Sequence, residues 1–362
     1  MPQAVMVTVR LATAAELGDW DRLVARFPNC RIVHKRAWIE WLEACGHGTP
    51  LYLVFERDQE VVGAIPGLLV RIGLLRLYGS PLPGWQTPAM GPVFDPARVS
   101  TDELIGALVP FLERRHGVHH VELLSAHLDA GPMQALGFRP ESVPTYRAKL
   151  YPGDEARMMK ALKESARRNI KRAAKLGLVA RIEDDEAIVA EHYAQLQEVF
   201  VRGGNTVSFG LERAHEFFRH MRAAGKLLAV SVYLPEGVNI ATGLFTLDDR
   251  ELLLWSWAHR TAHRWYRPTE LLTWTVMTRA MAAGCDTLDF MGLGEFKTKF
   301  GAELDATKYR WVRSRYRWLA RARDLAERGY RWQQSLRGRL ARMLIFGWRR
   351  AADEPDRAES PA

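Results

Sequence analysis

Residues 227–258 read LLAVSVYLPEGVNIATGLFTLDDRELLLWSWA and carry the clearest strand pattern in the chain. Three apolar runs are separated by the polar turns PEGV and DDR, a pattern that predicts an antiparallel meander. Helices are predicted before it at 186–201 and 211–224 and after it at 268–283, followed by the buried strand TLDFM at 287–291. Helices and a meander in one unit indicate an α+β fold.

The first half of the chain repeats this order without obvious sequence identity. Apolar runs at 51–56 and 60–71 flank a polar turn, and a helix is predicted at 101–115. Strands are predicted at 120–126 and 146–151, and the last strand of the second half starts at 309. Two similar orders suggest a duplicated unit.

The length of 362 residues and the hydrophobic content of 48% suit two domains, since domains usually hold roughly 100–200 residues. We expect a first domain over 1–155, a second domain over 156–318 and a basic helical tail over 319–362 with a disordered end. The number of subunits does not follow from the sequence.

The second domain opens with a basic stretch, KESARRNIKRAAKLGL at 163–178, which holds six cations and one acid. On a helical period its apolar residues share one stripe: Met159, Leu162, Ala166, Ile170 and Ala173. A face of one charge sign indicates a polyanion such as phosphate, RNA or anionic lipid. The alternative is a solvated charged face.

The C-terminal tail carries the excess charge, because residues 308–362 hold 15 cations and six acids while the whole chain has a net charge of +9. Aromatic and apolar residues alternate with its arginines: Trp318, Trp332, Leu336, Leu340, Met343, Phe346 and Trp348. This pattern fits a helix on a membrane surface, a helix that binds RNA, or a helix packed on the body of the protein.

Several classes of protein are disfavoured by the sequence. The three cysteines, Cys30, Cys45 and Cys285, are odd in number and lack a CxxC spacing, which argues against a disulfide framework and a zinc site. The start of the chain does not resemble a signal peptide, and no apolar run is long enough for a membrane span. We expect a cytoplasmic protein, in contact with the inner face of the membrane if the tail binds there, without a metal or a tightly bound cofactor.

Five motifs carry a resemblance to a known family: HKRAW at 34–38, YGSPLP at 78–83, LKESARRNIKRAAKLGL at 162–178, YRPTELLTW at 266–274 and DFMGLGEFKTKFG at 289–301. Over roughly 31–318 the chain resembles the FemAB family, in particular its exopolysaccharide-associated branch. The resemblance implies two tandem GNAT-like acyltransferase domains, a basic helix at their junction that lines the approach to a cleft, and a tail packed on the first domain.

The resemblance also implies a reaction. The enzyme would transfer an aminoacyl or acyl group from aminoacyl-tRNA, acyl-CoA or an acyl carrier protein to an amine, in cell-envelope, polysaccharide or specialised peptide biosynthesis. Lys297, in the FKxxFG motif, would stabilise the oxyanion in a cleft. Asp289 is either a buried, hydrogen-bonded acid or a group that orients the acceptor amine. The competing hypothesis is a non-catalytic module that binds RNA or a membrane surface.

Further residues are predicted to bind the substrate. The stretch HRTAHRWYRPTELL stands where GNAT enzymes that use coenzyme A have a glycine-rich phosphate loop, and its side chains would replace backbone amides. The predicted binding residues are Arg260, Arg264, Tyr266 and Arg267 of this stretch, Arg167, Arg168 and Lys171 of the basic helix, Lys299, and Trp38 of HKRAW. Glu40 stands near the place where characterised relatives have a phosphate-binding lysine, which argues against a nucleotide sugar bound in the same manner.

Overall fold

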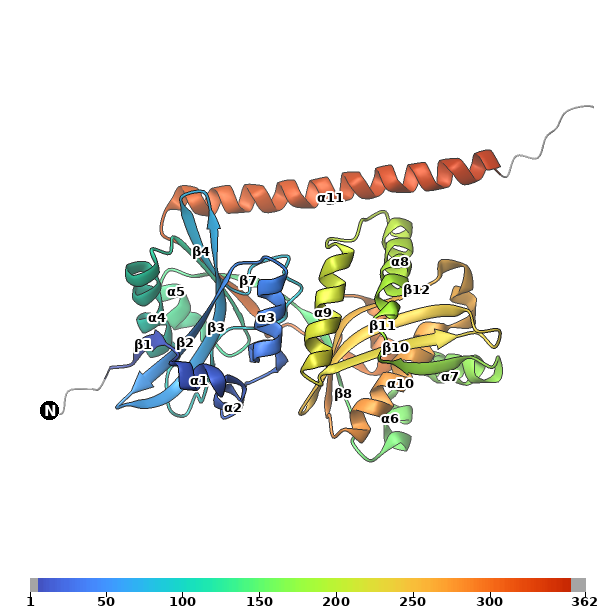
Figure 1. Cartoon of the computed structure of the whole chain (residues 1–362), viewed down its shortest axis with the longest axis horizontal. Helices are drawn as coiled ribbons and strands as arrows, with labels where there is room; N and C mark the ends of the chain where they lie inside the picture. Colours follow the sequence, from blue (N-terminus) through green and yellow to red (C-terminus); the bar gives the residue numbers. More distant parts are fainter. Residues whose placement is uncertain (1–5, 353–362) are drawn as a thin grey trace, which may run out of the picture.

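The computed structural model describes residues 6–352, with side chains up to Tyr330 and at 332, 333, 336 and 337. Two β-sheets lie next to one another, each flanked by helices, and a long C-terminal helix passes along both (Figure 1). This arrangement confirms the predicted α+β fold with two similar units.

The first sheet has the strand order β1-β2-β3-β4-β6-β15-β7, and β5 pairs with β3. Its strands are β1 (Thr8–Leu11), β2 (Thr49–Arg57), β3 (Glu60–Ile72), β4 (Leu75–Ser80), β5 (Val93–Phe94), β6 (His120–Ser125), β7 (Arg139–Ser142) and β15 (Tyr309–Ser314). Its helices are α1 (Ala14–Gly18), α2 (Trp20–Val24), η1 (Ile32–His34), α3 (Arg36–Ala44), α4 (Thr101–His116) and α5 (Ala130–Ala135). Ser100 and Glu103 form a capping box at the start of α4, which ends at Gly117 in the left-handed conformation.

The second sheet has the order β14-β8-β13-β12-β11-β10-β9. Its strands are β8 (Thr145–Lys149), β9 (Val179–Glu183), β10 (Leu227–Tyr233), β11 (Asn239–Asp248), β12 (Glu251–His259), β13 (Thr287–Asp289) and β14 (Ala302–Asp305). Its helices are α6 (Glu155–Ala161), α7 (Glu164–Lys175), α8 (Ala187–Arg202), α9 (Leu211–Ala223), η2 (Thr261–Tyr266), α10 (Pro268–Ala282) and η3 (Glu295–Phe300). The predicted meander is confirmed as β10, β11 and β12.

Two strands cross between the sheets, which corrects the predicted assignment of strands to the two halves. β8 lies in the second sheet although the boundary at 155 assigns it to the first domain, and β15 lies in the first sheet although the boundary at 318 assigns it to the second. Trp311 of β15, for example, pairs with Leu123 of β6. Such pairing depends on contacts between distant residues, so neither strand could be assigned to a sheet from local sequence.

A shared hydrophobic core joins the two domains. Trp38 and Trp41 of α3 pack against Phe217 of α9 and Trp255 of β12, and the ring centroids of Trp41 and Phe217 are 5.3 Å apart. Edge-to-face aromatic pairs of this kind stabilise an interface beyond the area that they bury. The core therefore holds the two sheets in a defined relative position.

Strand β12 contains a bulge. Leu244 of β11 pairs with Ser256 and the next residue, Phe245, pairs with Leu254, so Trp255 is the additional residue. Parallel pairing of β12 with β13 is confined to 251–253 and 287–289. β13 ends there and β12 continues to His259; η2 and α10 follow β12, and η3 follows β13.

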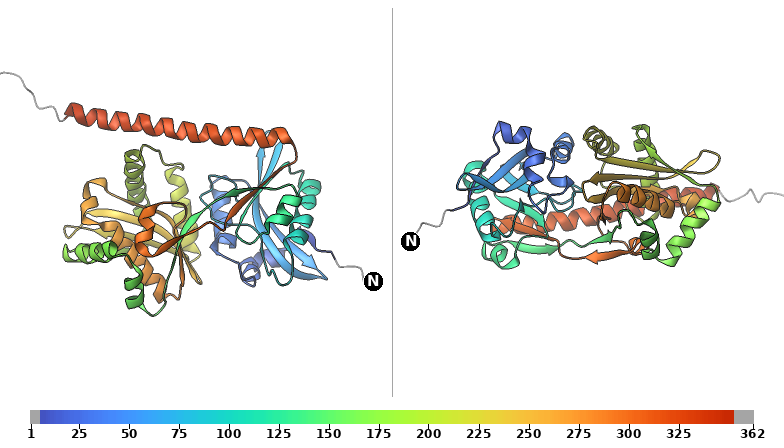
Figure 2. Two further views of the ribbon diagram at one scale, coloured as in Figure 1. Left: turned by 180° about the vertical axis from the view of Figure 1, so that it is seen from behind. Right: turned by 90° about the horizontal axis from the view of Figure 1, so that it is seen from below.

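The basic stretch at 163–178 forms α7, and the predicted apolar stripe is confirmed, because Ala166, Ile170 and Ala173 are buried. A break at Leu162 separates α7 from α6. α7 packs on α10 and η3. It lies at the end of the second domain remote from the first (Figures 1 and 2), so the prediction that it lines the junction of the domains is wrong.

The tail forms α11 (Arg317–Ala352), which contacts β15 and α8. Leu319 is buried against the body, but Trp318, Trp332 and Leu336 are exposed. Packing on the first domain therefore accounts only for the beginning of the helix. Four further predicted tail positions have side chains outside the described residues, namely Leu340, Met343, Phe346 and Trp348, and the predicted disordered end, 353–362, lies outside them too.

Candidate functional site

Lys297 lies in η3, the short helix that follows β13. Its Nζ donates hydrogen bonds to three backbone carbonyls, at 2.6 Å to Met291, 3.0 Å to Gly292 and 3.3 Å to Leu293. The segment that supplies them is tightly turned, with φ of 46° at Met291 and 147° at Gly294, a conformation that costs energy in a non-glycine residue such as Met291.

The ammonium of Lys297 is enclosed rather than open to a cleft. Its side chain is only 7% exposed, and it lines none of the three cavities that we find among the described residues. Burial lowers the pKa of Lys297 to about 8, although Asp289 acts in the opposite direction. The prediction of a cleft at Lys297 is therefore not met in this conformation.

Asp289, at the end of β13, is fully buried and forms four hydrogen bonds. It accepts from Lys308 Nζ at 2.7 Å, Arg31 at 3.0 Å, Thr145 Oγ1 at 2.8 Å and the backbone N–H of Met291 at 2.9 Å. Burial alone would raise the pKa of Asp289, but Lys308 and Arg31 outweigh it and hold the pKa below its usual value. Of the two predicted alternatives, the buried, hydrogen-bonded acid matches this geometry.

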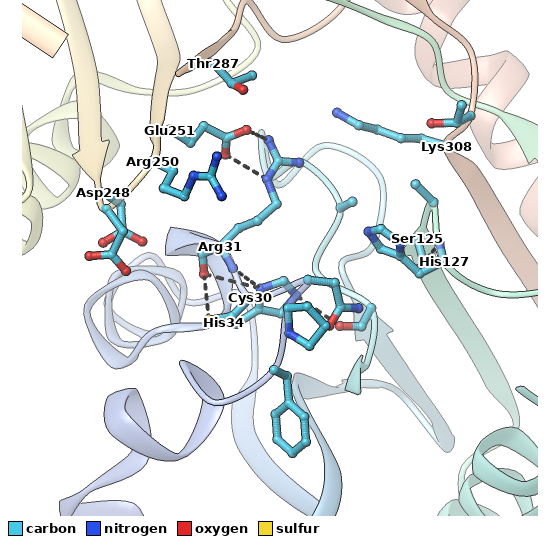
Figure 3. A pocket seen from close by; sticks show the side chains of 18 of the residues that line it. Cys30, Arg31, His34, Ser125, His127, Asp248, Arg250, Glu251, Thr287 and Lys308 are labelled. Atoms are coloured by element: carbon cyan, nitrogen blue, oxygen red, sulfur yellow. Dashed lines mark hydrogen bonds and ion pairs between the residues drawn. The ribbon is translucent and has the colours of Figure 1, made fainter. Parts of the chain in front are cut away.

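A cavity of about 600 Å³ lies between the two domains next to this cluster (Figure 3). Loops of the first domain, including Arg31 and His127, face the turn between β11 and β12 and residues near β13 and β14. Arg31 forms a two-pronged ion pair with Glu251 across the domain boundary. The size and the position at a domain interface are those of a ligand site.

Most charged groups that line this cavity pair with one another. Arg147 contacts Glu251 at 3.2 Å and Asp305 at 3.6 Å, and Arg250 pairs with Asp286. The ring of His127 differs, because no hydrogen bond to it occurs among the residues that the structure describes. Burial, Arg31 and Arg147 lower the pKa of His127, so its ring is neutral at pH 7.

A second feature is formed by two segments that are distant in sequence. The guanidinium of Arg172 on α7 lies 6.0 Å from the centroid of the Trp265 ring in η2, and Trp265 packs against Tyr266 with ring centroids 3.6 Å apart and ring planes tilted by 30°. Trp265 is 48% exposed. Three further exposed cations share the face of α7 that carries Arg172, namely Arg168, Lys171 and Lys175, and the exposed Arg264 and Arg267 flank the aromatic pair in sequence. We name these six cations and Trp265 the basic surface.

No ion pair in the described part of the chain joins a cation of the basic surface to an acid, so their charge is available to an external ligand. Four predicted binding residues, Arg168, Lys171, Arg264 and Arg267, belong to this surface, and the predicted Tyr266 lies directly beneath Trp265. The structure thus brings together two predicted groups that lie about 90 residues apart in sequence.

Three other predicted binding residues have structural partners instead. Arg260 pairs with Glu191 and Glu198 of α8. Arg167 donates to the carbonyls of Lys160 and Leu162 and so closes the end of α6. Trp38 is fully buried in the core between the domains. A guanidinium or an indole suits a binding site and a structural contact alike, so the residue type could not distinguish them.

Lys299 has a structural partner but is only partly buried. Its Nζ is 3.5 Å from Glu270, which is buried in the first turn of α10 and also accepts from Asn169 of α7 at 2.8 Å. The backbone carbonyl of Lys299 accepts from the N–H of Lys163. These contacts attach α7 to α10 and η3, which orients the basic surface relative to Lys297.

No local sequence pattern identifies the groups around the inter-domain cavity. Arg31 and Glu251 are 220 positions apart and Arg31 and Asp289 are 258 apart, and neither Arg31 nor Lys308 belongs to a motif that local spacing could single out. Among the described residues no cluster of three or more His, Cys, Asp or Glu side chains could hold a metal ion. In the same part of the chain, no helix has the length and apolarity of a membrane span.

Comparison with known proteins agrees with the topology. Residues 160–299 match the acetyltransferase (GNAT) domain family. The crystal structure of FemX superposes with a TM-score of 0.67 at 14% identity, over 83% of this chain and 96% of that chain. No curated protein matches the chain by sequence.

Two further structures share the fold at low identity. A conserved protein of unknown function from Bacteroides thetaiotaomicron has a TM-score of 0.53 at 12% identity, over 85% of this chain and 99% of its own. L-PGS from Bacillus licheniformis has a TM-score of 0.51 at 11% identity, over 88% of this chain and 97% of its own. These comparisons confirm the predicted FemAB-like fold: the chain has the fold of FemX, and its residues 160–299 match the acetyltransferase (GNAT) domain family.

Proposed function

We propose that the protein transfers an aminoacyl group from aminoacyl-tRNA to an amine, with the tRNA held on the basic surface. The observation that carries the proposal is that six exposed cations, none in an ion pair among the described residues, lie on α7 and on the segment that leads into α10, where Arg172 contacts the exposed Trp265, in a region that matches a GNAT domain. Cations attract the phosphates, and Trp265 offers a face on which a base can stack.

An acyl thioester of coenzyme A is the weaker candidate donor. The cations of α7 alone extend over about 11 Å of helix, from Arg168 to Lys175, which is more than a single diphosphate requires. The segment before α10 contains no glycine, and Pro268 at the first helical position has no N–H to donate. A grip by backbone amides at this helix start is therefore poor, whereas side-chain cations suit a long polyanion.

In the reaction, the acceptor nitrogen attacks the ester carbonyl carbon and forms a tetrahedral oxyanion. The C–O ester bond then breaks, and the terminal ribose oxygen of the tRNA takes up the proton that the amine loses. Lys297 stabilises the oxyanion when its Nζ exchanges one of its three carbonyl partners for that oxygen. The acceptor in this proposal is an amine of an envelope, polysaccharide or peptide precursor.

The binding test compares tRNA with coenzyme A over a salt series. Wild type should bind a total tRNA pool with a steep salt dependence, and the Arg168→Glu/Lys171→Glu variant should bind it weakly, with a slope of log affinity against log salt reduced by roughly 1.5–2. The control, Arg26→Glu/Arg115→Glu, reverses two exposed arginines of the first domain and should bind as the wild type does. Tight binding of coenzyme A without binding of tRNA would identify a thioester donor instead.

Turnover separates a transferase from a non-catalytic RNA-binding module. Charged tRNA should be deacylated faster when wild-type protein and an amine-containing host extract are both present. Lys297→Met should abolish this acceleration and leave tRNA affinity unchanged, because Lys297 lies outside the basic surface. Binding of tRNA without any acceleration in wild type would favour the module.

A further inference from the structure

α11 presents an apolar stripe that is largely exposed among the described residues. Trp318, Leu325, Trp332 and Leu336 recur at intervals of seven, seven and four residues and therefore lie on one side of the helix. They are between 42% and 69% exposed. A stripe of large apolar side chains left in water on one helix marks an interaction surface.

The opposite side of α11 is the one that holds the helix on the body. Leu319 is buried there, and Arg323 pairs with Glu122 of β6, Glu141 of β7 and Glu327 of its own helix. Asp324 pairs with Arg139 of the first domain. The acids of the described part of α11 are thus engaged with cations and lie away from the apolar stripe.

Cations border the stripe on its free flank. Arg321 follows Trp318 by three positions and Arg328 follows Leu325 by three, so each lies about 60° from the stripe. Both are exposed, and neither belongs to an ion pair among the described residues. Apolar side chains beside unpaired arginines match the interface of an anionic membrane, where the former enter the acyl boundary and the latter contact headgroups.

A second copy of the chain is a poorer occupant. A coiled-coil seam with Trp318, Leu325 and Trp332 at its a positions would place Arg321 and Arg328 at the d positions. Two charged d positions in succession would have to be buried against a like-charged partner, which disfavours pairing.

The tip of the β3–β4 hairpin reaches the same edge of the molecule as α11 (Figure 1). It exposes two large apolar residues, with Ile72 59% and Leu74 96% accessible, next to the exposed Arg71. Apolar and cationic groups are therefore exposed both on α11 and at the hairpin tip.

We propose that α11 and the tip of the β3–β4 hairpin form one docking surface for an anionic lipid bilayer. Trp318, Leu325, Trp332 and Leu336 insert at the headgroup boundary, and Arg321 and Arg328 bind lipid phosphates. The proposal concerns the location of the protein and does not depend on the reaction that it catalyses.

The test is flotation of the full-length protein with vesicles of phosphatidylglycerol and phosphatidylcholine, compared with vesicles of phosphatidylcholine alone. Wild type should float with the anionic vesicles, and Leu325→Gln/Trp332→Gln should lower the partition coefficient at least tenfold. The control, Val238→Gln/Leu304→Gln, removes two exposed apolar residues of the second domain and should float as the wild type does. Circular dichroism should show all variants folded, since the changed side chains are exposed.

Three outcomes would overturn the proposal. The first is equal flotation of wild type and the α11 variant. The second is that wild type binds RNA but not vesicles, and that the α11 variant no longer binds RNA. This result would assign the helix to nucleic-acid binding. The third is a stable dimer of wild type in light scattering that the same variant converts to a monomer, which would make the stripe a contact between copies.

Discussion

Arg31, from the loop before η1 in the first domain, lies 3.0 Å from Asp289, at the end of β13 in the second sheet. The same carboxylate binds Lys308 in the segment that leads back to the first sheet. One buried acid therefore connects both domains and the returning chain, at the edge of the inter-domain cavity.

Asp289→Asn should destabilise the protein by about 3–5 kcal/mol, because it leaves two buried cations without their shared counter-charge. Urea unfolding at neutral pH measures the loss. Asp249→Asn is the matched control: Asp249 also pairs with a lysine of the first domain, Lys35, but is largely exposed, so the expected loss is below about 1 kcal/mol. Equal losses in both variants would contradict the role of Asp289.

Acid should reduce the difference in stability between wild type and Asp289→Asn. The pKa of Asp289 is lowered in the folded protein from its ordinary value of 3.8, so the stabilisation is complete above that value and is lost as the pH falls through the folded pKa. The free-energy difference between the two proteins, measured by urea unfolding at several pH values below 5, should fall steadily. A constant difference would show that Asp289 does not titrate as its surroundings imply.

Lys297→Met should lower kcat/KM by about 10²–10³, the loss expected when one oxyanion donor is removed. Lys299→Met should have a smaller effect, because Lys299 contacts Glu270 and Phe296. For wild type, kcat/KM should also fall as the pH rises through about 8, the pKa to which burial lowers Lys297, because the cation is lost there. A pH profile that stays flat to pH 9 would argue against a cationic Lys297 in the reaction.

The free energy of unfolding should rise with pH because of Lys297, whereas kcat/KM should fall. Between a folded pKa of about 8 and the ordinary value of 10.5, the unfolded chain binds more protons, so wild type gains stability as the pH rises. Lys297→Met lacks this gain. Denaturant unfolding of both proteins at pH 7.5 and pH 10 should therefore show wild type gaining relative to the variant, and no relative gain would place the ammonium in a better-solvated position.

Trp265→Ala should weaken tRNA binding by about 1–3 kcal/mol, the range for loss of one base-stacking side chain. Trp265→Phe should retain most of the affinity, since the aromatic face remains. Melting temperatures should stay close to wild type because the indole is half exposed. The measurement is a fluorescence titration with tRNA, and equal affinities of wild type and the alanine variant would remove Trp265 from the interface.

Arg260→Gln should reduce the thermal stability of the protein without changing its affinity for the tRNA donor. Its guanidinium connects the end of β12 to Glu191 and Glu198 of α8, so thermal unfolding should begin earlier while tRNA affinity is unchanged. The matched variant is Arg264→Gln, which should lower tRNA affinity and leave thermal unfolding unchanged. A loss of tRNA affinity in Arg260→Gln alone would restore Arg260 to the binding residues.

Patterns that repeat locally were predictable from the sequence, and contacts between distant residues were not. The meander at 227–258 and the buried stripe of α7 follow from periodicity, because burial on one face leaves a repeat in the sequence. The position of α7 on α10 depends on tertiary packing, and the pairing of Arg31 with Glu251 depends on the meeting of two domains. The predicted arginines show both outcomes: Arg264 is free for a ligand, whereas Arg260 is occupied by two acids.

The exchange of β8 and β15 between the sheets also constrains how the chain matures. β15 lies between β6 and β7 in the first sheet, so during synthesis this sheet stays open until residues 309–314 have left the ribosome, after every strand of the second sheet has been made. The first sheet therefore cannot be completed until the strands of the second sheet have been synthesised. A cut between the two halves leaves each fragment without one interior strand of its sheet. We therefore expect that neither half would fold as an independent module when expressed alone.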